Sequence, residues 1–277
     1  MSAPLKPPFI YFGGKVNVAK QIVPLLPEHE HYIEPYCGSL AVLLAKSPSR
    51  METVNDLDGR LVAFWRVLRD RPADLERACV LTPHSRAEYQ AAYEDAGDEL
   101  ERARRVWVVL TQGRGGAARH TGWRFFQDPN GSRISMPSYV SGYVSRIAPD
   151  ARRLVGVSLE CRPALEMVAA YGQHPGNLLY VDPPYLGSVR PGSEYRHEMR
   201  GDEEHRELLE NLLGCRASVV LSGYASPLYD DLLCTWSRRE IAARTGNGSG
   251  GSQARTEVVW SNRPFPQGHL FDLGEAS

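Results

Sequence analysis

The sequence predicts an α/β fold, with a mostly parallel sheet, an antiparallel terminal pair of strands and a mainly helical insertion. Three observations predict it. Strand-like apolar runs alternate with helical patterns near the N-terminus and again in the second half, the rhythm of parallel strands joined by helical crossovers. Between 72 and 147 helical patterns and a turn-rich stretch replace that rhythm. Near the C-terminus two strand-like runs flank a glycine- and serine-rich segment.

The first elements are strands that end on acids, each followed by a helical pattern. HYIE predicts a strand ending at Glu34, and METVNDLD predicts one ending near Asp56. SLAVLLAKS predicts a helix with Ser39 as its N-cap. DGRLVAFWRVLRD predicts a helix that places its apolar side chains on one face.

The middle of the chain breaks this rhythm. Helical patterns occur in ADLERACVL, SRAEYQAAYEDA and DELERARRVWVVLTQ, and GRGGAARHTGWRFFQDPNGSRISMP predicts a loop or hairpin. We therefore expect one domain made of residues 1–71 and 148–277, and an inserted second domain made of residues 72–147.

The strand and helix alternation then resumes. LVGVSLE, NLLYVD and ASVVLSGY predict strands, and RPALEMVAAY and DEEHRELLENLL predict helices. SRREIAA and TEVVWSN predict the terminal antiparallel pair, separated by the flexible segment RTGNGSGGSQAR.

Composition narrows the class of protein. The chain has 277 residues, of which 42% are hydrophobic, and a net charge of −1. Its five cysteines form no CxxC pair and no metal-ligand spacing, which favours reduced thiols, a cytoplasmic location and no metal. The N-terminus lacks the apolar core of a signal peptide, and no apolar run reaches the length of a membrane span.

Positive charge is concentrated in one segment. Residues 101–153 contain ten arginines against Glu101, Asp128 and Asp150, a net charge of +7, so the rest of the chain carries −8. A basic segment in an acidic protein indicates contact with a polyanion such as nucleic acid. A solvated arginine-rich face is the alternative.

Acids end several predicted strands. Glu34, Asp56 and Asp182 follow strands directly, and a fourth strand ends near Glu160. Ligands of an open parallel sheet bind beyond the carboxyl ends of its strands, where acids accept hydrogen bonds from hydroxyls and amines. One such acid alone more often caps the following helix, but four at one edge favour a ligand site.

Asp182-Pro183-Pro184-Tyr185 is the most specific stretch. Pro184 holds Pro183 extended, and two fixed φ angles aim the carboxylate of Asp182. That carboxylate and the Pro183 carbonyl form paired acceptors suited to a planar NH2 group, and Tyr185 offers a flat face to a ring. The pattern predicts catalysis by positioning of an amine that attacks a methyl group, without a protein nucleophile.

With these residues the chain resembles the Dam-type DNA adenine methyltransferases, which are Rossmann-like and use S-adenosylmethionine without a metal. The resemblance covers most of the chain and keeps the family's motif order, through YFGGK, EPYCGSLAV, VNDLD, DPPY and LSGY. TGWRFFQDPNGSRISMP loosely resembles the family's target-recognition hairpin.

Site residues follow from the resemblance, position by position. It implies a catalytic set of Asp182, Pro183, Pro184 and Tyr185, and cofactor contacts from Tyr11, Lys15, Glu34, Gly38, Asp56, Glu160, Cys161 and Asp182. For DNA contacts we select Arg114, Arg119, His120, Trp123, Arg124 and Arg133. Trp123 either probes a groove or anchors its loop.

Three positions depart from the family pattern. Leu40 replaces a second glycine in the Glu34 loop and is expected to change the path of that loop or to weaken cofactor binding. Ile10 replaces a lysine, which removes a DNA contact. Glu160-Cys161 replaces a more common Asp-aromatic pair.

The resemblance implies methyl transfer to adenine N6 in a specific sequence of double-stranded DNA, with base flipping, EC 2.1.1.72. The alternatives are cytosine N4, RNA or a protein amide as acceptor, or a DNA-binding relative without catalysis. The sequence leaves open the recognition site, the oligomeric state and whether a cognate restriction endonuclease accompanies the protein.

Overall fold

The computed structural model describes residues 4–125, 134–186, 199, 201–245 and 253–266. Part of the predicted recognition hairpin, including Arg133, and residues 246–252 of the predicted flexible segment lie outside the described residues.

A seven-stranded sheet forms the centre of the molecule, in the order β3-β2-β1-β4-β5-β7-β6. Strands β1 to β5 pair in parallel, whereas β7 runs antiparallel to both β5 and β6. The predicted mostly parallel sheet and its terminal antiparallel pair are therefore confirmed. The strands are β1 His31–Glu34, β2 Met51–Asn55, β3 Val157–Glu160, β4 Asn177–Val181, β5 Ser218–Gly223, β6 Ser237–Thr245 and β7 Gln253–Ser261.

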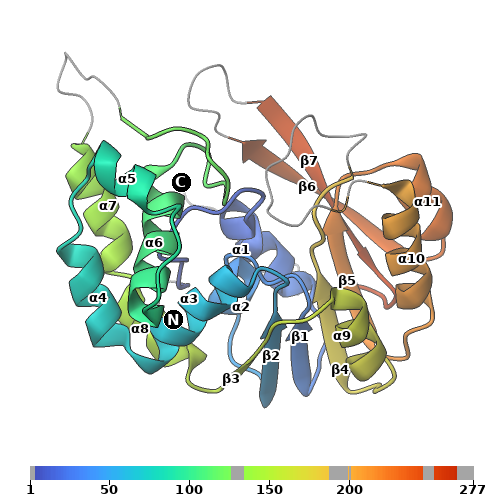
Figure 1. Cartoon of the computed structure of the whole chain (residues 1–277). Helices are drawn as coiled ribbons and strands as arrows, with labels where there is room; N and C mark the ends of the chain where they lie inside the picture. The colour runs from blue at the N-terminus through green and yellow to red at the C-terminus, as the bar shows by residue number, and fades with distance from the viewer. Residues whose placement is uncertain (1–3, 126–133, 187–198, 200, 246–252, 267–277) are drawn as a thin grey trace, which may run out of the picture.

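Helices cover both faces of the sheet (Figure 1). Helices α9, α10 and α11 lie on one face, and α1, α2 and α3 lie on the other, where the group α4 to α8 packs outside them. The short 3-10 turns are η1 Lys15–Asn17 and η2 Val23–Leu25. The helices are α1 Ala19–Ile22, α2 Ala41–Ala45, α3 Gly59–Asp70, α4 Pro72–Val80, α5 Arg86–Ala91, α6 Glu99–Gln112, α7 Met136–Val144, α8 Ile147–Leu154, α9 Ala164–Tyr171, α10 Asp202–Leu213 and α11 Pro227–Leu232.

Alternate residues of each central strand supply two hydrophobic cores. In β4, Leu178 and Tyr180 enter the core shared with α2, α3 and α6, whereas Leu179 and Val181 enter the core shared with α9 and α10. This is the period-two alternation of a strand that is buried on both faces. It explains why NLLYV is apolar throughout and why polar function begins only where the strand ends.

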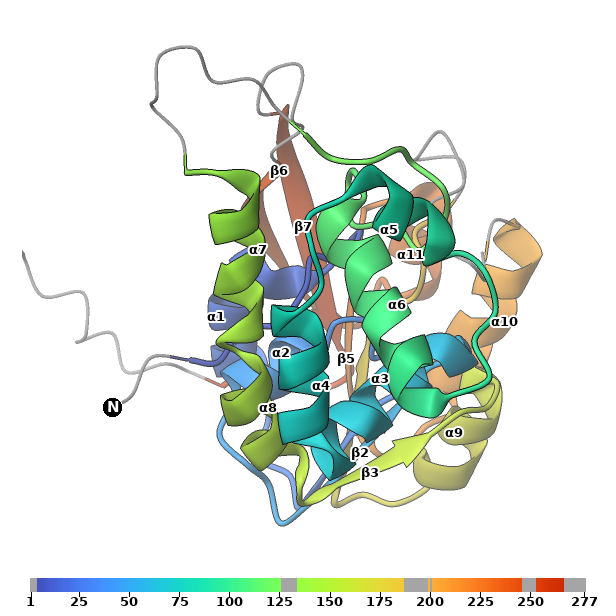
Figure 2. The same cartoon turned by 60° about the vertical axis from the view of Figure 1, so that its left-hand side comes forward.

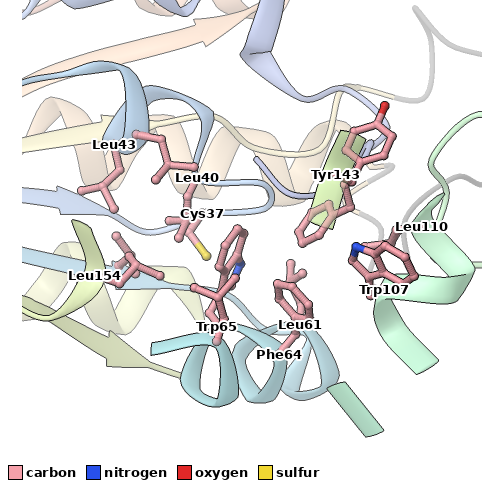
Figure 3. Packing of buried hydrophobic residues seen from close by; sticks show 14 of the residues in the cluster. Cys37, Leu40, Leu43, Leu61, Phe64, Trp65, Trp107, Leu110, Tyr143 and Leu154 are labelled. Carbon is pink, nitrogen blue, oxygen red and sulfur yellow. The ribbon is translucent and has the colours of Figure 1, made fainter. Parts of the chain in front are cut away.

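The larger core continues into the predicted insertion. Trp65 of α3 is fully buried, and its core also contains Trp107 of α6 and Tyr143 of α7 (Figure 3). Figure 2 shows α4, α7 and α8 side by side on the outer side of this layer. Helix α4 begins at Pro72, where we expected the insertion to begin, and the division into two domains stays a proposal.

The loop before α2 differs from the predicted local structure. We expected Ser39 to cap the helix, but Leu40 is the N-cap, with φ of 55° and no side-chain capping bond. Leu40 is also fully buried (Figure 3). Packing of its side chain in the core therefore compensates for a left-handed backbone that is costly for leucine.

Candidate active site

The carboxyl ends of β1, β2 and β4 meet at one edge of the sheet. Glu34 pairs with Val54, one residue before the end of β2, and β1 pairs in parallel with β4, which ends just before Asp182. Glu34, Asp56 and Asp182 all line one pocket of about 300 Å³. Three of the four acids predicted to meet at this edge thus do so around a cavity, and Glu160 does not line it.

Backbone donors fix the Asp56 side of the pocket. The N–H of Gly38 donates to one oxygen of Asp56 at 2.9 Å, and the N–H of Asp58 donates to the other at 2.9 Å. Trp65 donates its indole N–H to the Gly38 carbonyl at 3.0 Å. The Asp56 carboxylate is therefore held at the pocket wall by a loop that the core anchors.

Gly38 is required here for space and for backbone conformation. Its φ is +45°, a region that side chains disfavour. A Cβ at this position would lie 3.0 Å from the ring of Tyr11, which also lines the pocket. The segments YFGGK and EPYCG, which we predicted to share a site, are therefore in direct contact.

Glu34 is buried beside the pocket. It accepts a hydrogen bond from the Tyr32 hydroxyl at 3.1 Å. Burial raises the pKa of Glu34 well above its usual range, the bond from Tyr32 opposes this, and repulsion from Asp182 raises it further. The carboxyl group at position 34 therefore favours a protonated state or a nearby cation.

A buried lysine lies next to Asp182 at the pocket. The Nζ of Lys15 lies 2.7 Å from Oδ1 of Asp182 and 3.3 Å from Oε1 of Glu257. Lys15 also donates to the Tyr185 hydroxyl at 2.5 Å. Although burial lowers the pKa of Lys15, Asp182 and then Glu257 outweigh it, so the pKa lies well above its ordinary value. Lys15 is a buried cation among acids.

Asp182 is held at the pocket by a hydrogen bond from the neighbouring strand β5. Ser222 of β5 donates to Oδ1 of Asp182 at 3.1 Å, and Tyr180 shares a hydrogen bond with Ser222 at 2.9 Å. Burial raises the pKa of Asp182, while Lys15 and then Ser222 oppose this. The carboxylate is therefore aimed by β4 and β5 together.

Tyr185 and the two prolines surround this carboxylate. Pro184 lines the large pocket, whereas Pro183 and Tyr185 line a smaller hollow beside β5. The Tyr185 ring stacks on Tyr224 with centroids 4.2 Å apart, and its hydroxyl donates to Glu257 at 3.2 Å. Stacking of Tyr185 on a base, and acceptance by the Pro183 carbonyl, stay predictions.

Glu160 and Cys161 do not line the pocket. Glu160 is paired with Arg162 at 3.3 Å and accepts from the Tyr171 hydroxyl at 3.4 Å. Cys161 is exposed. The predicted cofactor contacts of these two residues therefore stay predictions that their positions do not favour.

The predicted DNA-contacting residues that the structure describes, which exclude Arg133, lie around the end of α6 and are exposed or half-buried. Trp123 stacks on His84, with centroids 4.5 Å apart, and donates to Gln112 at 3.3 Å. Arg86, which we did not select from the sequence, lies over the Trp123 ring at 4.9 Å. This geometry favours Trp123 as an anchor of its loop.

The other selected residues frame the same surface. Arg114 and His120 are exposed, and Arg114 shares a backbone hydrogen bond with Gly122. His120 stacks on Tyr93 at 4.2 Å, and Tyr93 donates to the carbonyl of Arg119 at 3.0 Å. Arg124 donates to the Tyr139 hydroxyl at 3.1 Å.

Several arginines of the basic segment are already neutralised within the chain. Glu101, which the net charge already includes, pairs with Arg104 and Arg105, and two acids outside the segment also take part, because Glu88 pairs with Arg104 and the buried Glu52 pairs with Arg153. The segment therefore offers fewer charges to a polyanion than its net charge of +7 suggests.

Sequence analysis missed Glu257, Ser222 and Tyr224. Glu257 is 3% exposed and lies within β7. In the sequence, the one indication of its role was a charged residue directly before the apolar run VVW of a predicted strand.

Among the described residues, no group of three His, Cys, Asp or Glu could hold a metal ion. No helix in the described part of the chain is long and apolar enough to cross a membrane.

Comparison with known proteins identifies relatives. The model of the D12 class N6 adenine-specific DNA methyltransferases matches residues 11–245. The retron Ec67 DNA adenine methylase of Escherichia coli is 25% identical over 264 residues, which cover 89% of this chain and 88% of the relative.

Solved structures are more distant. A precorrin 8W decarboxylase from Methanobacterium thermoautotrophicum matches with a TM-score of 0.40 and 10% identity, covering 93% of this chain and 97% of that one. The rRNA methyltransferase aviRa from Streptomyces viridochromogenes matches with a TM-score of 0.34 and 14% identity, covering 88% and 81%.

Proposed function

The chain belongs to the D12 class N6 adenine-specific DNA methyltransferase family, and from this premise we propose that it methylates adenine within a specific sequence of duplex DNA, after the base has flipped out of the helix. The observation that carries the proposal is the position of Asp182. Its carboxylate follows β4 directly, is held by Ser222 and lines the pocket. An extrahelical base could bring its amine to this carboxylate, whereas a base inside the duplex could not.

The charge of the pocket lining suits S-adenosylmethionine. Its lining contains Glu34, Asp56, Asp58 and Asp182, which complement the positive sulfonium and ammonium groups of that molecule. When bound, S-adenosylmethionine supplies the methyl group and the sulfur leaving group. We assign Asp56 to the ribose hydroxyls because backbone N–H groups hold both of its oxygens at the pocket wall.

Asp182 acts on the amine by accepting its hydrogen bond. With the Pro183 carbonyl as second acceptor, the two N–H bonds of adenine N6 are held in the plane of the base. The nitrogen lone pair is then directed out of that plane toward the methyl group. Such positioning and electrostatic stabilisation require no protein nucleophile. The N6 proton is released after transfer.

Arginines near the end of α6 hold the DNA backbone. We assign phosphate contacts to Arg114, Arg119 and Arg124, which are exposed or half-buried near the end of α6, and to Arg133 of the same basic segment, which lies outside the described residues. Phosphate contacts position the duplex and carry no sequence information directly. Replacing Arg114 with alanine should weaken binding to all sequences alike and reduce the dependence of affinity on salt.

Transfer of tritium from labelled S-adenosylmethionine tests the function. Unmethylated genomic DNA, RNA and protein are offered separately, and the nucleosides of the labelled product are analysed. We expect N6-methyladenine in DNA, and sequencing of the methylated DNA should show one recurring motif. Label in N4-methylcytosine, in RNA or in protein would contradict the proposal.

A further inference from the structure

The ammonium group of Lys15 has more acceptors than hydrogens. Its Nζ lies 2.7 Å from Asp182, 2.5 Å from the Tyr185 hydroxyl, 3.3 Å from the Gly13 carbonyl and 3.3 Å from Glu257. An ammonium group carries three N–H bonds. Because Lys15 is only 4% exposed, water cannot readily make up the difference. Asp182 and Glu257 therefore compete for one cation.

Glu257 is the less satisfied of the two carboxylates. Its Oε1 is buried and accepts no hydrogen bond from any described residue, although it faces the ammonium group at 3.3 Å. Its Oε2 accepts from Tyr185 at 3.2 Å. A buried acceptor without a donor costs free energy. The site thus contains a second place where the Lys15 ammonium could bind.

Methyl transfer to an amine gives a reason for such a place. While Lys15 is bound to Asp182, it reduces the negative charge that Asp182 can offer to an incoming amine. Nitrogen also gains positive charge as it attacks, and two like charges in a buried site repel strongly. The cation therefore has to move away from Asp182, or be neutralised, for the reaction to proceed.

We propose that Glu257 takes the Lys15 ammonium from Asp182 when the target amine enters, and so leaves the Asp182 carboxylate to that amine. The Tyr185 hydroxyl, bonded to both Lys15 and Glu257, keeps its contacts with both during the exchange. Glu257 is thus a positioning residue that acts through Lys15. This inference rests on the proposed function, because it requires an amine as acceptor.

The antiparallel strand explains how Glu257 reaches the site. Val258 pairs with Gly223, the last residue of β5, so the first half of β7 lies at the edge where the parallel strands end. A parallel strand at this place would have brought its last residues there instead. Glu240 of β6, which pairs with Val258, is a matched control because it forms an exposed ion pair with Arg238.

Steady-state methylation of unmethylated genomic DNA tests the proposal. Glu257→Gln keeps the shape of the side chain but cannot hold the ammonium as an ion pair. We expect kcat to fall by about tenfold or more, while KM for DNA and for the cofactor stays within about twofold. Glu240→Gln should retain wild-type values. A kcat for Glu257→Gln within about twofold of wild type would overturn the proposal.

A second pair of variants separates positioning from a structural effect. If Glu257 acts only by removing Lys15 from Asp182, then Glu257→Gln should cause no further loss in a Lys15→Met background. Equal losses in both backgrounds would overturn the proposal. Folding of each variant is checked by cofactor binding in a calorimeter. If the Lys15→Met variant does not bind the cofactor, the kcat of Glu257→Gln alone decides whether the proposal stands. A wild-type chain that labels no adenine in DNA would instead refute the proposed function itself.

Discussion

The two sides of the pocket differ in what holds their carboxylates. On the side that we propose for the cofactor, backbone N–H groups of Gly38 and Asp58 bind Asp56, and these donors cannot leave without unfolding the loop. On the side that we propose for the methyl acceptor, the charged partner of Asp182 is the side chain of Lys15, which has a second carboxylate within 3.3 Å. The comparison teaches that one side is fixed in advance, while the other contains a contact that can be exchanged.

Removal of the Asp182 carboxylate should have the largest effect on methyl transfer. Asp182→Ala deletes the group that we propose to bind the target amine, so methyl transfer should fall by about 10²–10³-fold. Cofactor affinity should change little, because the other acidic residues of the pocket remain. Single-turnover transfer of labelled methyl groups measures the first, and calorimetry measures the second. Asp231→Asn, an exposed acid of α11, is the control. If Asp182→Ala kept near wild-type turnover, Asp182 would not bind the target amine, and the proposed difference between the two sides of the pocket would be wrong.

Removal of the Asp56 carboxylate should instead weaken cofactor binding and leave kcat almost unchanged. Asp56→Ala deletes an acceptor whose loss we expect to raise the cofactor Kd by about 10–100-fold, while kcat at saturating cofactor stays close to wild type. Titration calorimetry and initial rates measure the two quantities. Asp74→Asn, in the exposed pair with Arg71, should change neither. If Asp56→Ala lowered kcat at saturating cofactor and left Kd alone, the roles of the two sides would be reversed.

The Leu40→Gly variant tests what stabilises the loop that holds Asp56. Leu40→Gly relieves the left-handed backbone at φ 55° but empties a fully buried position. The lost packing, about 2–5 kcal/mol, should exceed the relieved strain of about 1–2 kcal/mol, so the free energy of unfolding should fall by about 1–3 kcal/mol. Urea unfolding measures it. A stabilised Leu40→Gly would show that strain, rather than packing, dominates this loop.

Asp150 is a buried acid that, unlike Asp182, has no lysine beside it among the described residues, so it serves as a comparison. Both of its oxygens are buried without a hydrogen-bond partner in the described part of the chain, and burial raises its pKa to about 8, against the effect of Arg146. The folded state then holds a proton that the unfolded state releases near pH 4, so stability should fall as pH rises from about 4 to 8.

Asp150→Asn should reduce this dependence. We expect a gain of about 1–2 kcal/mol at pH 8.5 and a smaller change at pH 6, measured by urea midpoints at both values. Asp231→Asn is again the exposed control. An equal shift of Asp150→Asn at both pH values would show that the carboxyl group at position 150 does not titrate in this range.

Local patterns were sufficient for much of the fold and for part of the site. The alternation of strands and helices predicted the parallel sheet, and strand ends on acids predicted that Glu34, Asp56 and Asp182 would meet at one edge. Helix α3 forms where DGRLVAFWRVLRD predicts a helix with one apolar face, because apolar periodicity depends on neighbours in the chain. The prediction for Ser39 was wrong because core packing of Leu40 outweighed the local preference.

By itself, the sequence determined where strands end and which acid follows each, since backbone propensity, periodicity and proline geometry act over a few residues. Only the tertiary structure decided which charges meet. Lys15 pairs with Glu257 because β7 runs antiparallel between β5 and β6, and Arg153 of α8 pairs with Glu52 of β2, which lies 101 residues earlier in the chain. Electrostatic pairing depends on distance in space, and residues from opposite ends of a chain come together only when the whole sheet has formed.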